Sequence, residues 1–269
     1  MRIGKAVIIA RKDLRDTFSS KFMVASLVLP YVMMVLVSLL LIALPIFFGS
    51  EFYKYIAPGE LEKIKDTLPE TRGMSEMQLF PYMIGTLVLP FLFLVFSLAS
   101  SSIITADSFA GERERKTIEP LLAAPITNSE LFLGKILASI IPTLTLLYAS
   151  FGVCCLLINL VTAKAFDYLW FPPLKTSLMV CVIGPLYIFL GMCLVIIGSS
   201  RARTVKEASN YAGILILPLL IVFIAQLGGL VIMETMKILL SALIISIIDF
   251  SIFRLAYSTF NSETMIVAP

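Results

Sequence analysis

The stretch GERERKTIEPLLAAPITNSELFLGK, residues 111–135, breaks the apolar pattern of the chain in which it lies. Residues 77–106 before it and residues 136–163 after it contain no Asp, Glu, Lys or Arg. Each of these uncharged runs exceeds the roughly 20 residues that a helix needs to cross a bilayer. Within the quoted stretch, charges of both signs surround a small apolar cluster. The pattern predicts a hydrophilic loop between two membrane-spanning helices.

The composition supports this interpretation for the whole chain. Of its 269 residues, 59% are hydrophobic and 14% charged, where soluble proteins have about 45–50% and about 25%. Because the apolar residues are concentrated in uncharged runs, a water-soluble enzyme is excluded. We predict an all-α integral membrane protein with six transmembrane helices in one domain over residues 22–260. The expected spans are residues 22–48, 79–106, 136–163, 176–200, 208–233 and 238–253.

The distribution of Lys and Arg predicts the orientation. Basic residues cluster before the first span, in the loop 107–135 and in the loop that contains Arg201 and Arg203. Because cytoplasmic loops are enriched in Lys and Arg, we expect these segments on the cytoplasmic side of the cell (plasma) membrane. Both termini, including a tail of residues 261–269, are then cytoplasmic, and the loop 49–78 is external. Asp249 in the sixth span must lie near the headgroups or face protein.

Residues 1–21 predict an amphipathic helix before the first span. Apolar residues recur there at steps of three or four, at Ile3, Val7, Ala10, Leu14 and Phe18. A basic amphipathic helix next to a membrane span is expected in the interface plane, with its apolar side in the acyl boundary. It either fixes the topology alone or also contacts a cytoplasmic partner.

The loop 107–135 has a pattern of its own. The second span can continue as a helix to Lys116, and Thr117 can cap a short helix with an apolar face. That face consists of Ile118, Leu121, Leu122, Pro125 and Ile126. Thr127 and Glu130 have the spacing of a capping box that begins the next helix. An exposed apolar patch of this kind marks a protein contact, unless it folds back onto the membrane surface or the N-terminal helix.

No catalytic or metal-binding pattern occurs in the sequence. The chain has no His, which removes the commonest metal ligand. The four cysteines lie in predicted spans, where they pack between helices. No phosphate-binding GxxxxGK[ST] motif is present. We therefore expect no enzymatic activity, no cofactor and no metal in this chain, and no nucleic-acid partner.

Residues 111–126, GERERKTIEPLLAAPI, resemble the signature loop of type 2 permeases of the ABC (ATP-binding cassette) transporters, in the sodium-exporter-like and multidrug-exporter-like group. Residues 131–135, LFLGK, continue the resemblance. Two further stretches are similar to the family, RKDLRD at residues 11–16 and SSRARTVKEA at residues 199–208. The external loop 49–78 is shorter than in many relatives.

The resemblance implies six transmembrane helices and a homodimer or heterodimer that binds two ATPase subunits, which hold ATP and Mg²⁺. A coupling helix between helices 2 and 3 would dock on the ATPase. Transferred to this chain, the docking residues are Glu112, Arg113, Glu114, Thr117, Ile118, Glu119, Pro120, Leu121, Leu122 and Pro125. A second cytoplasmic loop contributes Arg201, Arg203, Lys206 and Glu207.

The sequence thus predicts the permease subunit of an ATP-binding-cassette exporter, coupled to separate ATPases. The alternatives are an ATP-independent channel or carrier, and a membrane scaffold that recruits a cytoplasmic protein without transport. The substrate stays open between sodium, a drug, a lipid or another compound.

Overall fold

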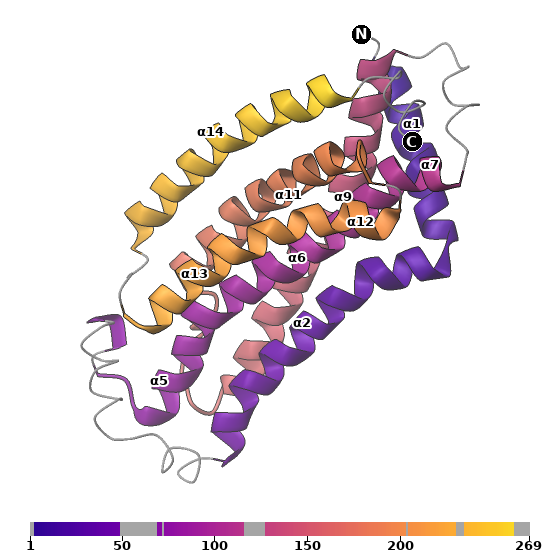
Figure 1. The fold of residues 1–269 in the computed structure, drawn as a ribbon. Helices are drawn as coiled ribbons and strands as arrows, with labels where there is room; N and C mark the ends of the chain where they lie inside the picture. Colours follow the sequence, from indigo (N-terminus) through magenta and orange to yellow (C-terminus); the bar gives the residue numbers. More distant parts are fainter. Residues whose placement is uncertain are drawn as a thin grey trace.

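The computed structural model describes residues 3–48, 69–71, 73–115, 127–202, 204–229 and 234–260. All regular secondary structure in these segments is helical (Figure 1). Six of the described helices are long and apolar enough to cross a membrane. They cover Lys21–Phe48, Met77–Gly111, Asn128–Thr162, Leu174–Ser199, Val205–Leu227 and Thr235–Thr259. The predicted all-α membrane fold with six transmembrane helices is confirmed.

The first span is α2 (Lys21–Phe48), which follows α1 (Ile3–Ser19), and the third is α9 (Asn128–Thr162). The sixth is α14 (Thr235–Thr259). The other three spans each consist of several helical segments. The second contains α5 (Glu76–Met83), η2 (Ile84–Val88), α6 (Leu89–Ala106) and η3 (Asp107–Gly111), and it continues into α7 (Glu112–Glu114). The fourth contains α10 (Leu174–Leu178), η4 (Met179–Ile183) and α11 (Gly184–Ser199); the fifth contains α12 (Val205–Asn210), η5 (Tyr211–Leu215) and α13 (Ile216–Leu227). A short helix η1 (Pro69–Thr71) precedes the second span.

Three of these irregular turns have the same local cause. A proline lacks the N–H that a helix needs and clashes with the carbonyl group four residues earlier. In each case that carbonyl falls inside a π or 3₁₀ turn, which relieves the clash. The pairs are η2 before Pro90, η4 before Pro185 and η5 before Pro218.

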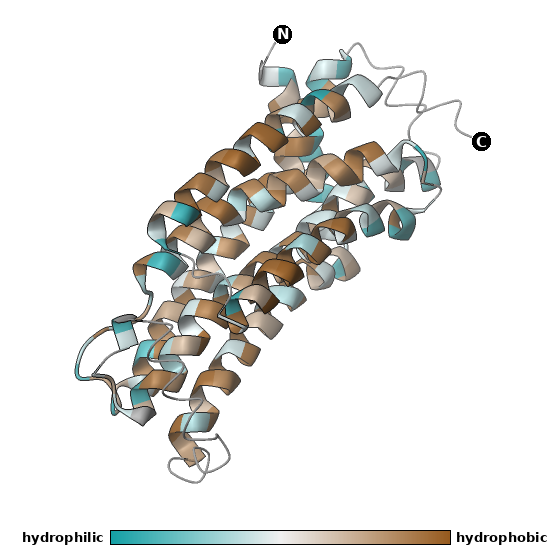
Figure 2. Cartoon of the chain, turned by 60° about the vertical axis from the view of Figure 1, so that its left-hand side comes forward, coloured by the Kyte–Doolittle hydropathy of each residue, from teal (hydrophilic) through white to brown (hydrophobic). Residues whose placement is uncertain are grey.

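The helices pack side by side into one bundle (Figure 1), and hydrophobic residues predominate along them (Figure 2). α6 packs on α2, α9 and α11, and α14 packs along α11. The outward sides of α2, α13 and α14 expose large apolar residues such as Leu36, Ile221 and Ile247. This arrangement is typical of helices whose outer faces contact lipid. Asp249 of α14 is buried, and its two carboxylate oxygens have no hydrogen-bond partner among the described residues.

α1 lies across one end of the bundle, against the first turns of α9 (Figure 1). Its buried residues are Ala6, Ile9, Ala10 and Asp13. The approach to α9 is close: a Cβ atom added at Gly134 would lie 2.8 Å from the carbonyl oxygen of Ala6. Val7 and Phe18 of the predicted apolar stripe are more than half exposed. The side of α1 that packs on the protein is therefore rotated from the predicted stripe, because small residues allow the close contact and leave bulky ones outside.

The opposite end of the bundle is closed by residues 163–173, which we call the cap segment. Its Phe166, Trp170 and Phe171 are buried in the apolar core. Asn159 of α9 holds Phe171 through two hydrogen bonds: its side-chain amide donates to the Phe171 carbonyl at 2.6 Å and accepts from the Phe171 N–H at 3.2 Å. The Trp170 indole N–H donates to Thr162 Oγ1 at 2.8 Å. These contacts attach the cap segment to the last turns of α9.

Candidate functional site

The structure describes the two ends of the loop 107–135. Arg113 is described by its backbone alone. Several predicted docking residues lie outside the described residues, namely Thr117, Ile118, Glu119, Pro120, Leu121, Leu122 and Pro125, and so does Arg203 of the second loop. The predicted continuation of the second span is confirmed as far as Glu114, because helical structure extends through η3 and α7 to that residue; Lys116, the predicted end, lies outside the described residues.

Lys135 of α9 contacts the residues at which the loop begins. Its side chain on α9 is almost completely buried, with 1% exposed. The ammonium Nζ lies 2.6 Å from Glu112 Oε2 and also donates to the backbone carbonyl of Ser108. It lies 5.5 Å from the centre of the Phe109 ring, within cation–π range. A residue of the third span thereby holds the end of the second.

α1 adds further charges to the same point. Asp13 Oδ2 lies 3.8 Å from Lys135 Nζ and accepts a hydrogen bond from Ser108 Oγ at 3.2 Å. Lys12 Nζ lies 3.6 Å from Glu112 Oε1 and 3.5 Å from Asp13 Oδ1. We call Lys12, Asp13, Ser108, Glu112 and Lys135 the junction cluster. It joins α1, the end of the second span and α9.

The electrostatics of the cluster differ between its exposed and buried parts. Burial lowers the pKa of Lys12, but the carboxylates of Asp13, Glu112 and Asp16 raise it more, and the pKa lies above its ordinary value. Lys12 is half exposed, so water screens these pairs and each contributes little to stability. The Lys135–Glu112 pair is buried, and removal of one partner leaves an uncompensated charge. Loss of Lys135 is therefore the change that costs the cluster most.

A second ion pair, between Arg115 and Asp107, lies at the start of the loop. The Arg115 guanidinium donates to both carboxylate oxygens of Asp107, at 2.8 and 3.4 Å. Hydrogen bonding to Asp107 raises the pKa of Arg115 above its ordinary value. A Cβ atom at Gly111 would lie 2.7 Å from Asp107 Oδ1 and 2.9 Å from Arg115 Nη2. Glycine at this position leaves room for the pair.

The other end of the loop begins α9 as predicted. Thr127 Oγ1 accepts from the Glu130 N–H at 3.3 Å, and the Thr127 N–H donates to Glu130 Oε2 at 3.1 Å. These two bonds form the capping box, so that prediction is confirmed. The hydroxyl groups of Ser129 and Tyr257 lie 2.6 Å apart, and the Phe132 ring packs edge-on against Tyr257. The sixth span thus supports the point where the loop returns.

The second predicted cytoplasmic loop, which contains Arg201 and Arg203 in the sequence, contacts the first loop through the backbone of Val205. The Val205 N–H donates to Glu114 Oε2 at 2.9 Å, and Thr204 caps α12 by accepting from the Glu207 N–H at 3.2 Å. Arg201, Lys206 and Glu207 are exposed. The structure therefore brings Glu114 and the start of α12 together, and leaves Arg201 and Lys206 on the surface.

The sequence patterns did not single out Lys12, Asp13, Ser108 or Lys135 as site residues. The position of Lys135 directly before the uncharged run 136–163 is a signal that could have pointed to them, since a lysine at the start of an apolar helix must find a partner where it is buried. Within the described residues, no group of three or more His, Cys, Asp and Glu could hold a metal ion. The arrangement connects α1, the end of the second span and α9.

Comparison with known proteins agrees with this architecture. The sequence model of the family described as ABC-2 family transporter protein matches residues 7–266, a range that includes every member of the junction cluster. The ABC transporter permease protein NatB of Bacillus subtilis (strain 168) is 29% identical over 155 residues, which are 55% of this chain and 37% of that protein. The match thus spans little more than a third of that relative. Because the family model covers nearly the whole chain, the protein belongs to the ABC-2 family of transporter proteins and is a membrane permease subunit of an ABC transporter.

Proposed function

We propose that this permease couples ATP hydrolysis by separate ATPase subunits to export, and that residues 112–126 dock on the ATPase. The single observation that carries the proposal is the buried Lys135–Glu112 pair, 2.6 Å long, at the base of the loop. A loop that only linked two spans would not need a buried ion pair to fix its first turn. The pair therefore favours a loop whose position relative to α9 is fixed, as a contact that transmits movement of the ATPase requires.

The proposed mechanism follows from what holds each end of the loop. The outgoing end is held to α9 by Lys135 and to α1 by the other charges of the junction cluster. The returning end is the first turn of α9 itself. Any displacement of the docked loop must therefore shift α6, α9 and α1 together. Movement of packed helices as rigid units is a known way to convert local contacts into large-scale change.

The orientation and assembly complete the proposal. The end of the bundle that carries α1, α7 and α12 faces the cytoplasm, as the clustering of Lys and Arg supports. Both termini are cytoplasmic, and the protein lies in the plasma membrane. Two permeases, identical or related, pair and bind two ATPases, which hold ATP and Mg²⁺. The permease residues only bind the ATPase and transmit its movement.

The test is a pair of substitutions in the loop. Leu121→Asp with Leu122→Asp places two charges in the proposed apolar contact, so we expect loss of the complex with the ABC ATPase of the same organism and loss of permease-stimulated ATP turnover in nanodiscs. The variant should remain folded and inserted, since the change lies in a hydrophilic loop. Leu169→Asp is the matched control, because Leu169 is 84% exposed in the cap segment at the other end of the bundle.

Either of two results would overturn the proposal. One is unchanged assembly and stimulation in the double variant. The other is the absence of any complex with the wild-type permease in a folded state, which would favour an ATP-independent channel or a scaffold.

A further inference from the structure

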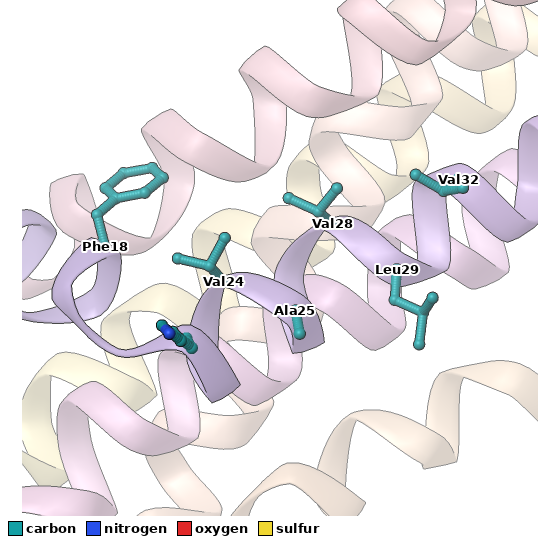
Figure 3. Close-up of a pocket in the computed structure, with 7 residues that line it drawn as sticks. Phe18, Val24, Ala25, Val28, Leu29 and Val32 are labelled. Atoms are coloured by element: carbon teal, nitrogen blue, oxygen red, sulfur yellow. The ribbon is translucent and has the colours of Figure 1, made fainter.

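A shallow groove of about 510 Å³ lies at the elbow between α1 and α2 (Figure 3). Lys21 and six apolar side chains line it: Phe18, Val24, Ala25, Val28, Leu29 and Val32. Phe18 comes from the end of α1, and the others from the first three turns of α2. Figure 3 shows Val24, Val28 and Val32 along one edge of α2, and Ala25 and Leu29 along the other. We call this feature the elbow groove.

The dimensions of the elbow groove match one leaflet of a bilayer. From Lys21 to Val32 the helix rises about 16 Å at about 1.5 Å per residue, and half of the hydrocarbon thickness is about 15 Å. Lys21 is the first residue of α2, so its ammonium lies where the span enters the headgroup layer. The groove thus has a cation at the headgroup level and an apolar trough along one leaflet.

The charges around the groove favour an anionic headgroup. Lys21 is exposed, and among the described residues that line the groove it alone is ionisable. Arg11 and Arg15 are exposed on α1, which lies across this end of the bundle. The acidic Asp16 on the same helix is paired with Lys12 at 3.7 Å. The elbow therefore presents a net positive edge next to the apolar trough.

The sequence of the trough favours an acyl chain over a second protein helix. Helices that pack in membranes bring small residues together at four-residue spacing. Along the outer side of α2, residues 25, 29, 32, 36 and 40 are Ala, Leu, Val, Leu and Leu. Ala25 makes one notch, and the larger side chains that follow prevent close approach of another backbone. A flexible acyl chain follows such a surface more readily than a rigid helix does.

We propose that the elbow groove binds one anionic phospholipid, with its phosphate at Lys21 and an acyl chain along Val24–Val32. The elbow joins α2 to α1, which carries Lys12 and Asp13 of the junction cluster. A lipid in the groove contacts both helices and holds α1 in place. The site does not depend on the direction of transport.

The experiment uses native mass spectrometry of the full-length chain, purified in mild detergent and incubated with phosphatidylglycerol or phosphatidylcholine. We expect the wild type to retain phosphatidylglycerol in preference to phosphatidylcholine. Lys21→Glu should reduce that preference by at least about fivefold, because one basic residue near an anionic surface strengthens binding by about that factor. Ala25→Trp, which fills the notch, should reduce retention of phosphatidylglycerol, and Lys21→Arg should keep it.

Two matched controls separate this site from general effects. Lys206→Glu reverses an exposed charge at the same end of the bundle, and Leu40→Trp enlarges a residue on the same side of α2 beyond the groove. Both should retain phosphatidylglycerol as the wild type does. Unchanged preference in Lys21→Glu, or equal losses in the controls, would overturn the proposal. So would conversion of a dimer to a monomer by Ala25→Trp, which the same mass spectra report, since a second copy would then occupy the groove.

Discussion

At the scale of single residues, Lys135 shows how a buried ion pair fixes the relative position of two helices. Removing two charges from water costs several kcal/mol per ion, and their mutual attraction often only offsets that cost. The Lys135–Glu112 pair therefore contributes little net stability, even though it is 2.6 Å long. What it does provide is position, because Lys135 has buried partners on both α1 and the end of the second span.

The pair contributes little net stability, but removal of one partner leaves a buried charge unpaired. This difference predicts the outcome of a double-mutant cycle. Lys135→Met leaves Glu112 and Asp13 without a buried cation, and we expect it to lower the free energy of unfolding by about 3–5 kcal/mol. Adding Glu112→Gln removes the nearest orphaned charge and should restore a substantial part of the loss. Thermal or denaturant unfolding in detergent measures both variants. Lys206→Met, at an exposed lysine, is the control and should unfold like the wild type.

A purely structural interpretation of the pair makes a different forecast. If Lys135 only filled space, the methionine, which is also long and flexible, would be tolerated in the single variant. Additive effects of the two substitutions would likewise show that Lys135 and Glu112 do not interact. Either result would contradict the assignment of the junction cluster.

At the scale of secondary-structure elements, the cap segment offers a spectroscopic handle. Trp170 is the only tryptophan of the chain, and it is buried, stacked on Phe166 with ring centres 4.7 Å apart. Its environment depends on Asn159, which holds the neighbouring Phe171 by two backbone hydrogen bonds. Tryptophan fluorescence therefore reports whether Trp170 of the cap segment is buried against the bundle.

Asn159→Ala should loosen the cap segment. The substitution leaves the N–H and C=O groups of Phe171 without their partner, at a cost of about 1–3 kcal/mol for each buried group. We expect acrylamide to quench Trp170 fluorescence more strongly in this variant than in the wild type. Leu169→Ala changes an exposed residue of the same segment and should leave the quenching unchanged. Equal quenching in Asn159→Ala and wild type would show that packing of the aromatic rings closes the cap without the amide.

The elements also show which features could be predicted from sequence. Uncharged runs located all six spans, because hydrocarbon tolerates few charges over about 30 Å. They did not locate the helix ends: α9 begins at Asn128, eight residues before the expected span at residue 136, since a helix continues beyond the hydrocarbon. Similarly, α13 ends at Leu227, where Gly229 adopts φ of 70° and turns the chain.

Contacts between distant parts of the chain could not be predicted in the same way. The Thr127–Glu130 box was predictable because its partners are three residues apart. Asp13 and Lys135 are separated by more than a hundred residues, and nothing in the local pattern of either identifies the other. The same holds for the Ser129–Tyr257 contact. The loop was recognisable from its sequence, whereas the junction that holds it follows only from packing.

At the scale of the whole molecule, α9 connects the two ends of the bundle. It carries Lys135 of the junction cluster near its start and Asn159, which holds the cap segment, near its end. The two residues are separated by about 36 Å along a helix that rises about 1.5 Å per residue. Because α9 remains one helix from Asn128 to Thr162, the junction cluster and the cap segment are attached to the same continuous element.

This continuity predicts coupling between nucleotide binding and the cap segment. In the complex with its ATPase, binding of a non-hydrolysable ATP analogue should change the acrylamide quenching of Trp170. The same complex with Trp170→Phe supplies the background from tryptophans of the ATPase. Lys135→Met should weaken the response while leaving ATPase binding in place, since the loop still docks but is no longer held to α9. Leu121→Asp with Leu122→Asp should abolish it together with binding. A full response in Lys135→Met would mean that the signal bypasses the junction cluster, and no response in the wild type would mean that the cap segment does not move with the nucleotide state.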